Sequence, residues 1–460
     1  MKIKTSSFFF AVIFISCFSE IFAQKDRGEE IIFCPPGLAL DSLPNFGLSF
    51  AKKAEAFMLY DVPNNRFEYE QPFKGTYSHH AHLAAIEGVV VAIWSNHYAD
   101  EDSPGQYVRY SISKDEGRTW ENPNPTIEHG TNFGAVLFPP MEVPIRNPQR
   151  IGEDGKKIYN LEFPLQGNRP HDSCGSGVTG NPGSDKNDNC GHYHLEMCAN
   201  GFAMANGRLF AIAEIAKGIN KVGVGRVVRE IESNGQLGDI FWLNDDFPDI
   251  KEITPNVINA ALYNNEGYEE KVALDIKKYL QDPLHMPQWD FKGRVQRDGK
   301  LASYYKSDRG VTGHEPTYAY IMKNGVYARL WRIKNDSINA HFSYDKGKSW
   351  TELERTGFPD NNSRQVAGSL PDGRIFVVNN PYSPSKERNP LVLSISEDGK
   401  KFDKAYIIRS GDSGARDITG RAKNLGFQYP HAIVAGNYLL VMYSINKESV
   451  EVTRIPLDQL

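Results

Sequence analysis

The sequence lacks the long apolar runs and the short motifs that mark several common protein classes. Beyond the N-terminus, no segment approaches the ~18 uninterrupted apolar residues that a membrane-spanning helix needs. There is no P-loop, no Gly-x-Gly-x-x-Gly turn after a strand, no Gly-x-Ser-x-Gly elbow and no His-Glu-x-x-His pair. These absences argue against membrane insertion and leave no support for a nucleotide-binding protein, a serine hydrolase or a zinc protease. No organic cofactor is expected.

The chain also has no strong excess of charge of either sign. The 52 basic and 57 acidic residues give a net charge of −5 at pH 7. The protein as a whole is therefore not expected to bind nucleic acid, and an anionic substrate would need a local basic pocket. Aromatic residues make up 12% of the chain, beside 40 Gly and 27 Pro. This mixture favours many short strands and turns, and it also suits sugar-binding surfaces.

The N-terminus has the composition of a secretory signal. Lys2 and Lys4 precede an apolar run from Phe8 to Ile15, and Ala23 is the small residue that signal peptidases favour. Residues 1–23 are therefore predicted to be a cleaved signal peptide. We expect a secreted or periplasmic protein, with lipid anchoring as the less favoured alternative.

Residues 24–460 are predicted to form one all-β catalytic domain, a β-propeller. No Pro- or Ser-rich linker divides them. Strand-like runs recur with hairpin signals such as Asn206-Gly207 and Asn324-Gly325, which is the pattern of antiparallel meanders. The length fits seven blades, or six. We expect the strand from Val450 to Ile455 to close the ring by sharing a blade with the other end of the chain, and the protein to be a monomer.

A single helical pattern interrupts the strands. From Tyr268 to Leu280, the apolar residues Val272 and Ile276 recur at helical spacing. This segment is predicted to be one inserted loop helix packed on the rim of the domain.

Three segments share one turn pattern. In each, an Asp carboxylate can accept backbone N–H bonds, a Gly takes the positive-φ position and an aromatic residue packs beneath the hairpin. The pattern is an Asp-box and resembles the bacterial neuraminidase repeat of β-propellers. We expect Asp115, Asp345 and Asp398 to occupy equivalent turns on the outer rim, where they carry architecture and not chemistry. The segments are Ser113–Trp120, Ser343–Trp350 and Ser396–Phe402.

Histidines gather at the start of one predicted strand and at the end of the next. His79 and His80 open the first strand, and His97 follows the hairpin. These positions lie at the same end of a hairpin, so the imidazoles are expected to converge in a central canyon. There they can serve as base, acid or ligand. The sequence does not decide between His79 and His80.

The segment from Cys190 to Cys198 carries two Cys and two His within nine residues. Together with Cys174 upstream and one of the histidines, His192 in our assignment, it offers a Cys₃His set for structural Zn²⁺. Side chains alternate in an extended segment, so both histidines would face one side and Tyr193 the other, toward substrate. A disulfide among these cysteines fits an exported protein equally well, and both interpretations stay open.

Arginines lie in or beside strands of successive predicted blades. An anionic sugar requires such residues, because Arg binds a carboxylate through two parallel hydrogen bonds. Glu315 and Tyr429 add a carboxylate and a phenol in later blades, which keeps a glycosidase open as a rival. The four arginines are Arg208, Arg329, Arg332 and Arg364.

Further motifs accompany the Asp-boxes. They include Trp94-Ser95-Asn96-His97, Arg229-Glu230-Ile231, Leu370-Pro371-Asp372-Gly373-Arg374 and Gly426-Phe427-Gln428-Tyr429-Pro430. Over the whole mature chain these motifs resemble a sialidase-like propeller. Within that group the chain is most similar to exported lyases that cleave ulvan, in polysaccharide lyase family 25 and its relative family 24. True sialidases open with Arg-Ile-Pro, and the His79-His80-Ala81 segment stands in its place here.

The resemblance implies a seven-bladed propeller, structural zinc in some members, and an anionic sulfated polysaccharide as substrate. Cleavage would proceed by β-elimination at a uronate and leave 4,5-unsaturated uronyl ends. By the order of the residues in those families, the catalytic set is His80, His97, Tyr193 and Arg208. Arg208 would neutralise the carboxylate, and His80 and Tyr193 would move the two protons.

Four further residues are assigned to substrate binding, namely His79, Arg329, Arg364 and Tyr429. Two other functions stay open beside the lyase. One is a sialidase-type hydrolase in which Tyr429 is the nucleophile and Glu315 its base. The other is a glycan-binding propeller without activity.

Overall fold

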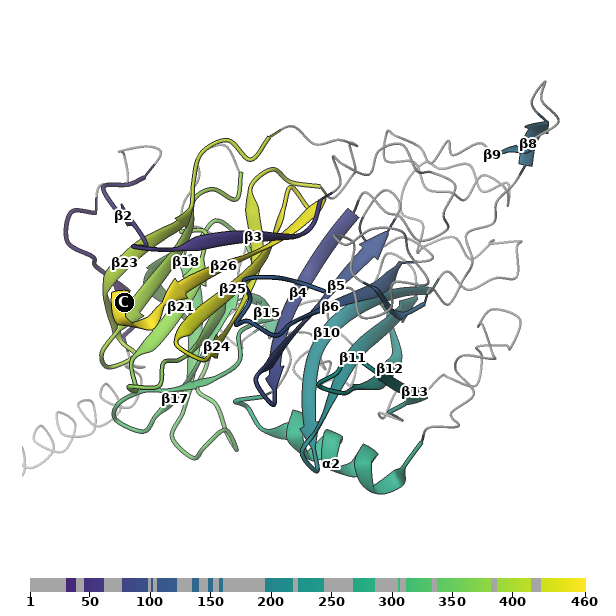
Figure 1. Cartoon of the computed structure of the whole chain (residues 1–460). Coiled ribbons are helices and arrows are strands. Elements are labelled where there is room, and N and C mark those ends of the chain that lie inside the picture. The colour runs from purple at the N-terminus through teal and green to yellow at the C-terminus, as the bar shows by residue number, and fades with distance from the viewer. Residues whose placement is uncertain are drawn as a thin grey trace, which may run out of the picture.

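A computed structural model of the protein shows strands wound round a centre, with one α-helix on the rim (Figure 1). It describes residues 30–38, 45–61, 77–97, 101, 106–121, 135–139, 148–151, 157–159, 195–217, 222–243, 268–285, 305–306, 312–332, 337–381, 387–414 and 423–460. Within these ranges the elements are strands, apart from the helix and a short 3₁₀ turn at Leu457–Gln459. The predicted all-β fold is confirmed.

Five antiparallel meanders make up most of the described structure. In three of them the strands pair in chain order, and in the β15–β19 meander β15 and β16 both pair with β17 and together take the place of the first strand. In the last meander the outer strand comes from the other end of the chain. The meanders are β4 (Tyr77–Ile86), β5 (Val89–His97), β6 (Tyr107–Ser113) and β7 (Ala135–Phe138); β10 (Leu195–Ala205), β11 (Arg208–Lys217), β12 (Val222–Ile231) and β13 (Leu237–Trp242); β15 (Thr312–Pro316) and β16 (Tyr320–Ile321) with β17 (Tyr327–Arg332), β18 (Ser337–Ser343) and β19 (Glu354–Pro359); β20 (Val366–Ser369), β21 (Ile375–Asn379), β22 (Leu391–Ser396) and β23 (Lys401–Arg409); and β24 (Phe427–Ala435), β25 (Tyr438–Ile445) and β26 (Ser449–Pro456) with β3 (Glu55–Tyr60).

Apolar side chains fill the space between successive meanders. Ile93 and Val108 of the β4–β7 meander pack with Met197 and Ala211 of the β10–β13 meander in one core. Strand β5 is buried at every position, because neighbouring meanders cover both of its faces. Each fully buried Val, Ile or Leu contributes about 1.5–3 kcal/mol, so these interfaces supply much of the driving force for folding.

The two ends of the chain close the ring together. Strand β3 pairs antiparallel with β26, as the predicted last strand required, and Figure 1 shows purple β3 beside the yellow strands. A second N-terminal strand, β1 (Ile32–Phe33), pairs parallel with both β19 and β23. It thereby joins two meanders into one continuous curled sheet. The predicted pairing of the last strand with a strand from the other end of the chain is confirmed, and the propeller blade that this pairing would complete stays a prediction.

The number of blades stays a prediction. The described residues contain five meanders, and the seven blades that the resemblance implies are not confirmed. Besides β1, four short strands lie outside the meanders: β2 (Ser49–Phe50), β14 (Tyr305–Lys306), and the hairpin of β8 (Pro148–Ile151) and β9 (Lys157–Tyr159). The first strands β4, β10, β16, β20 and β24 surround a central cavity of about 470 Å³.

The predicted loop helix is confirmed as α2 (Glu270–Gln281). Its apolar stripe, Val272, Ile276 and Leu280, packs on Phe210 and Phe241 of the β10–β13 meander. The helix therefore covers that sheet and belongs to the scaffold. No helix among the described residues is long and apolar enough to span a membrane.

The three Asp-boxes occupy the same turn of their meanders, between the third and fourth strands, as predicted. In the first, Asp115 Oδ1 accepts hydrogen bonds from Thr119 N and Ser113 Oγ, both at 2.8 Å. Asp345 and Asp398 accept the corresponding bonds in the other two boxes. Partial burial opposes ionisation of Asp115, but these hydrogen bonds outweigh it, and the pKa of Asp115 lies below the ordinary 3.8.

Asp115→Ala is expected to destabilise the fold by about 1–2 kcal/mol, because it removes the acceptor for two backbone N–H groups. The loss should shrink as the pH falls through the lowered pKa of Asp115, since the wild-type carboxylate then becomes protonated. Urea unfolding at pH 7 and at pH 3 measures both effects. Asp403→Ala is the control, because this half-exposed Asp makes a long ion pair to Lys401, at 3.7 Å, and lies outside the Asp-boxes. Equal losses in the two variants would contradict the expectation.

Candidate functional site

The first strands of four meanders carry a β-bulge that contains a residue with positive φ; in β10 this residue is Gly201, and in the other three it is not a glycine. These three residues are His80 (φ 54°) in β4, Glu315 (φ 39°) in β15 and Tyr429 (φ 55°) in β24. Such backbone costs of order 1–3 kcal/mol per residue for side chains other than Gly, and it is retained mainly at functional sites. The bulges re-aim these side chains, so they mark one end of the ring as the candidate site.

Tyr429 lies at the centre of this site, hydrogen-bonded to a carboxylate and a guanidinium. Its hydroxyl donates to Glu315 Oε1 at 3.0 Å and accepts from Arg332 Nη1 at 2.6 Å. Arg332 also donates to Glu315 Oε2 at 2.7 Å. Burial raises the pKa of Tyr429 to about 12, although Arg332 opposes the shift. The phenol is therefore protonated at neutral pH, with a carboxylate in place to accept its proton.

Four cationic side chains surround the Tyr429 ring. The guanidinium carbons of Arg332, Arg364 and Arg388 lie 5.7, 5.7 and 4.9 Å from the ring centre, and Lys447 Nζ lies 5.6 Å away. Arg388 is fixed by a 2.5 Å bond from Nη1 to Gln428 Oε1. Among the described residues, Glu315 pairs with Arg332 and Glu101 with Lys447. With four cations around one ring, the described part of the site favours an anionic ligand.

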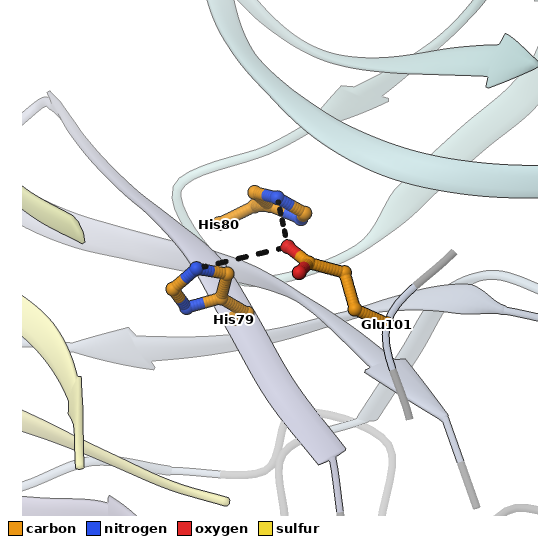
Figure 2. A group of neighbouring side chains, drawn as sticks. All are labelled: His79, His80 and Glu101. Carbon is orange, nitrogen blue, oxygen red and sulfur yellow. Dashed lines mark ion pairs between the residues drawn. The ribbon is translucent and has the colours of Figure 1, made fainter. Parts of the chain in front are cut away.

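Two adjacent histidines and a glutamate form the other half of the site. His79 and His80 direct Nε2 toward the same oxygen of Glu101, at 3.9 and 3.3 Å (Figure 2). Lys447 contacts the other oxygen of Glu101. The His79 ring lies 4.0 Å from the Tyr429 ring, centre to centre, so the two halves are in contact. Burial and then Lys447 hold the pKa of His79 well below 6.5, which keeps this imidazole neutral.

Behind these groups, a second pair of histidines packs against a buried arginine. Arg364 Nη2 lies 3.3 Å from His82 Nε2, and the His82 ring lies 5.0 Å from that of His431. Burial and then the Arg364 charge lower the pKa of both histidines, to about 3 for His431. His431 also lines the central cavity, so this pair connects the site to the cavity beneath it.

Asp360 is expected to make the stability of the site depend on pH. Burial raises its pKa to about 7, although Asn379 Nδ2 donates to it at 3.2 Å and Arg332 opposes the shift. The native state therefore holds this proton more tightly than the unfolded chain does. The contribution of Asp360 to the free energy of unfolding should be fully present below pH 4. It should be lost as the pH rises to 7, by up to about 4 kcal/mol.

Asp360→Asn should remove this loss. Melting temperatures of wild type and variant, measured from pH 4 to pH 8, should coincide at pH 4 and separate toward pH 7 with the variant the more stable. Asp275→Asn on α2 is the control for the general pH dependence. A constant difference between wild type and Asp360→Asn across this range would show that Asp360 does not titrate there.

The structure brings together four of the residues assigned from the sequence: His79, His80, Arg364 and Tyr429. Their side chains are all buried at the bulged end of the ring. His97 ends β5 opposite Tyr77 in the ladder and is also buried.

Arg208 lies elsewhere, which corrects its placement in the predicted catalytic set. It starts β11 at the hairpin end and pairs with Glu230 at 2.5 Å and Glu269 at 3.1 Å, with its side chain 36% exposed. The site contacts the other end of this sheet, where Ala199 N donates to Ser95 Oγ. From residue 199 to residue 205, opposite Arg208, the strand runs roughly 20 Å. The order of residues along the chain did not reveal which end of a strand each one occupies.

Arg329 is also displaced from the position expected for substrate binding. It lies on β17 three residues before Arg332, and its guanidinium carbon is 4.8 Å from the ring centre of Trp350, in the second Asp-box. His341 is stacked on the same Trp350 ring. Successive side chains of a strand alternate between faces, so Arg329 and Arg332 point to opposite sides of β17.

Three residues of the predicted Cys and His cluster and the predicted tyrosine lie outside the described residues. Cys198 is described; it is buried in β10, where its Sγ accepts a hydrogen bond from Gln106 Nε2 at 3.0 Å. Zinc or a disulfide at this cluster therefore stays a prediction. The signal peptide, residues 1–23, also lies outside the described ranges. The residues outside are Cys174, Cys190, His192 and Tyr193.

Three residues of the site were not singled out from the sequence: Glu101, Arg388 and Lys447. Each comes from a loop or turn, where no periodic pattern marks which side chain points inward. Lys447 follows Asn446 at the tip of the β25–β26 hairpin, and both have positive φ, at 58° and 57°. An Asn-Lys pair at a hairpin tip predicts a turn and gives no indication of a functional role.

Comparison with known proteins agrees with this fold. Residues 293–441 match the BNR repeat-like domain family. A solved structure titled "Sialidase" is 22% identical, with a TM-score of 0.61 over 93% of this chain and 35% of its own. Trypanosoma rangeli sialidase is 12% identical over 88% of this chain and 60% of its own, with a TM-score of 0.45. The intramolecular trans-sialidase from Ruminococcus gnavus is 11% identical over 88% and 99%, also at 0.45.

The fold is sialidase-like, with BNR (Asp-box) repeats. The chain spans about a third of the length of the first structure and 60% of the second. None of the curated proteins matches it. At these identities the likeness concerns the fold, and function has to be argued from the site.

Proposed function

We propose that the chain is an enzyme that cleaves an acidic glycan beside a carboxylated sugar, with Tyr429 as the reacting group. The observation that carries the proposal is the hydrogen-bonded set of Tyr429, Glu315 and Arg332 among further cations. The Glu315 and Arg332 side chains are 10% and 17% exposed, so the set reaches the surface. Sialidases and trans-sialidases among the structures of similar fold agree with a glycan substrate.

The arginines would bind the carboxylate of the sugar. Guanidinium groups form paired, charge-assisted hydrogen bonds with carboxylates, and burial strengthens them. Arg364 and Arg388 are both buried beside Tyr429, where burial lowers their pKa values. A bound carboxylate would restore the charge balance, so an acidic sugar should bind far better than its neutral amide or ester.

Hydrolysis is the reaction that the Tyr429–Glu315 contact favours. Glu315 would accept the phenol proton while Tyr429 Oη attacks the anomeric carbon, and Arg332 would stabilise the phenolate as it forms. The glycosidic oxygen would leave with a proton from the His80–Glu101 pair. Water would then break the tyrosyl–sugar bond and release the free sugar.

β-Elimination is the second candidate, and the contact between His79 and Tyr429 favours it. A neutral imidazole could take the C5 proton of a uronate while the phenol protonates the departing C4 oxygen, with the arginines neutralising the carboxylate. This is the ulvan lyase activity that the sequence resemblance implies. In this version Tyr429 takes the proton-transfer role that the resemblance gives to Tyr193, and the arginines around Tyr429 take the role given to Arg208.

One assay separates these chemistries. The purified protein is incubated with sialylated oligosaccharides and with uronate polysaccharides, ulvan included, in water labelled with oxygen-18. Hydrolysis should yield a saturated product that carries label at its new hydroxyl. Elimination should yield an unlabelled product with the ultraviolet absorbance of a 4,5-unsaturated uronate. Binding to acidic glycans without any cleavage would overturn the proposal in favour of a binding protein.

A further inference from the structure

His79, His80 and Glu101 turn three metal-ligating atoms toward one point (Figure 2). Nε2 of each imidazole and Oε1 of Glu101 all lie within 4.8 Å of one another, and the three side chains are buried. Ligand atoms at ~2.0–2.2 Å from a tetrahedral zinc ion lie roughly 3.3–3.5 Å apart. The 3.3 Å from His80 to Glu101 already fits this spacing, and the 3.9 Å from His79 needs only a small rotation.

A hydrogen bond on the far side of the His79 imidazole directs its Nε2 lone pair toward this point, and His80 has a neighbour of the same kind. His79 Nδ1 lies 2.7 Å from Ser444 Oγ, whose own hydrogen is directed to the carbonyl of Gln428 at 3.4 Å. Ser444 is thus placed to accept from Nδ1–H, which leaves the lone pair of His79 on Nε2. Ser95 Oγ holds the matching place beside Nδ1 of His80, at 3.2 Å. This is the arrangement by which outer partners orient metal-ligating histidines.

Without an ion, the contact between His79 and Glu101 is unfavourable. Among the described residues, none forms a hydrogen bond with Nε2 of His79. At 3.9 Å, Nε2 is too far from Glu101 for a hydrogen bond, and its lone pair faces a carboxylate oxygen. Lys447 contacts the other oxygen of Glu101. A cation between Nε2 and Oε1 would replace this repulsion with two attractive contacts.

The backbone is shaped to produce this convergence. Side chains of consecutive strand residues point to opposite faces, yet the rings of His79 and His80 lie 4.7 Å apart, centre to centre. The bulge in β4 and the positive φ of His80 bring them to one side. The strain needed for a pair of inward imidazoles supports a role that requires two of them.

We propose that His79, His80 and Glu101 hold one divalent transition-metal ion, such as Zn²⁺. It would be bound through the two Nε2 atoms and Oε1, and it would keep at least one coordination position for water or a ligand oxygen. The proposal goes beyond glycan cleavage, because it concerns binding of the ion alone. The ion would occupy both Nε2 atoms, so the proton transfers assigned above to His79 and His80 belong to the ion-free protein. It is also separate from the zinc predicted at the Cys and His cluster, which would use sulfur ligands.

Cobalt titration of the full-length protein tests the site without any substrate. After removal of metal by a chelator, Co²⁺ should add one equivalent with the visible spectrum of nitrogen and oxygen ligands and no thiolate charge-transfer band. His80→Ala and Glu101→Gln should lose this equivalent. Ser444→Ala should keep it with about 10–100-fold weaker affinity, because it removes only the outer partner of His79.

Two controls and a second measurement complete the test. His285→Ala, at an exposed histidine on the C-terminal side of α2, should bind as wild type does, and Cys198→Ser should remove only sulfur-ligated metal. Added Zn²⁺ should raise the melting temperature of wild type but not of His80→Ala. Equal cobalt affinity in wild type, His80→Ala and Ser444→Ala would overturn the proposal, as would a cobalt spectrum with thiolate ligands alone. Neither readout depends on glycan cleavage, so the two proposals fail independently.

Discussion

Tyr429→Phe is expected to lower turnover on the acidic glycan by at least roughly four orders of magnitude while the protein stays folded. The variant lacks the only atom of the side chain that can attack carbon or move a proton. Glu315 and Arg332 keep their mutual contact at 2.7 Å, so neither charge is left without a partner. The melting temperature should therefore change little, and initial rates with circular dichroism of the same preparations measure both quantities.

Tyr320→Phe is the matched control for this experiment. Tyr320 is another fully buried tyrosine, and its hydroxyl donates to the carbonyl of Gly399 at 3.0 Å, away from the site. Its loss should cost about 1 kcal/mol of stability and leave turnover unchanged. If the Tyr429→Phe protein kept turnover within tenfold of wild type, the reaction would not pass through Tyr429, whichever of the two chemistries operates.

Gly426→Ala is expected to destabilise the protein by about 3 kcal/mol and to reduce activity as well. Gly426 has φ +106°, and a Cβ there would lie 2.4 Å from the carbonyl oxygen of Arg388. The backbone of Arg388 is hydrogen-bonded to the residues on both sides of this glycine. Arg388 N donates to Leu425 O, and Phe427 N donates to Arg388 O. Displacing it would move the Arg388 guanidinium, which lies 4.9 Å from the ring of Tyr429.

Gly373→Ala separates strain from collision. Gly373 has a similar φ of +91°, but a Cβ there would meet nothing within 4 Å. This variant should lose only about 1 kcal/mol and keep full activity. Urea unfolding and initial rates for both proteins give the comparison. Matching losses at the two glycines would mean that contact between Gly426 and Arg388 does not hold the site together.

Features with a local physical cause could be predicted from the sequence. The Asp-boxes follow from hydrogen bonds within a few residues, and the α2 helix follows from the spacing of Val272, Ile276 and Leu280. The pairing of the last strand with the other end of the chain followed from its place near the C-terminus. The number of meanders is not local in this way, because it depends on how loops of unequal length pack.

The site was predictable only in part. The paired histidines and the Tyr429 motif were informative because those residue types are unusual on inner strands. Arg208 was misplaced because order along a chain does not say which end of a strand a residue occupies. Arg388 and Lys447 reach the site from a loop and a turn, and β-bulges set the direction of the side chains around them. A β-bulge does not produce a periodic pattern of residues, so the sequence alone does not predict where one occurs.

Because β3 pairs with β26, the arrangement of the site depends on strands from both ends of the chain. The paired residues Tyr60 and Val450 lie about 390 positions apart, so this seam closes only after the last strand has been synthesised. His80 and Tyr429 stand on β4 and β24, the inner strands that meet beside the seam. A chain that has lost β3 or β26 would keep the pairing of its other meanders, but the strands beside the seam would lose a neighbour that holds the two halves of the site in register.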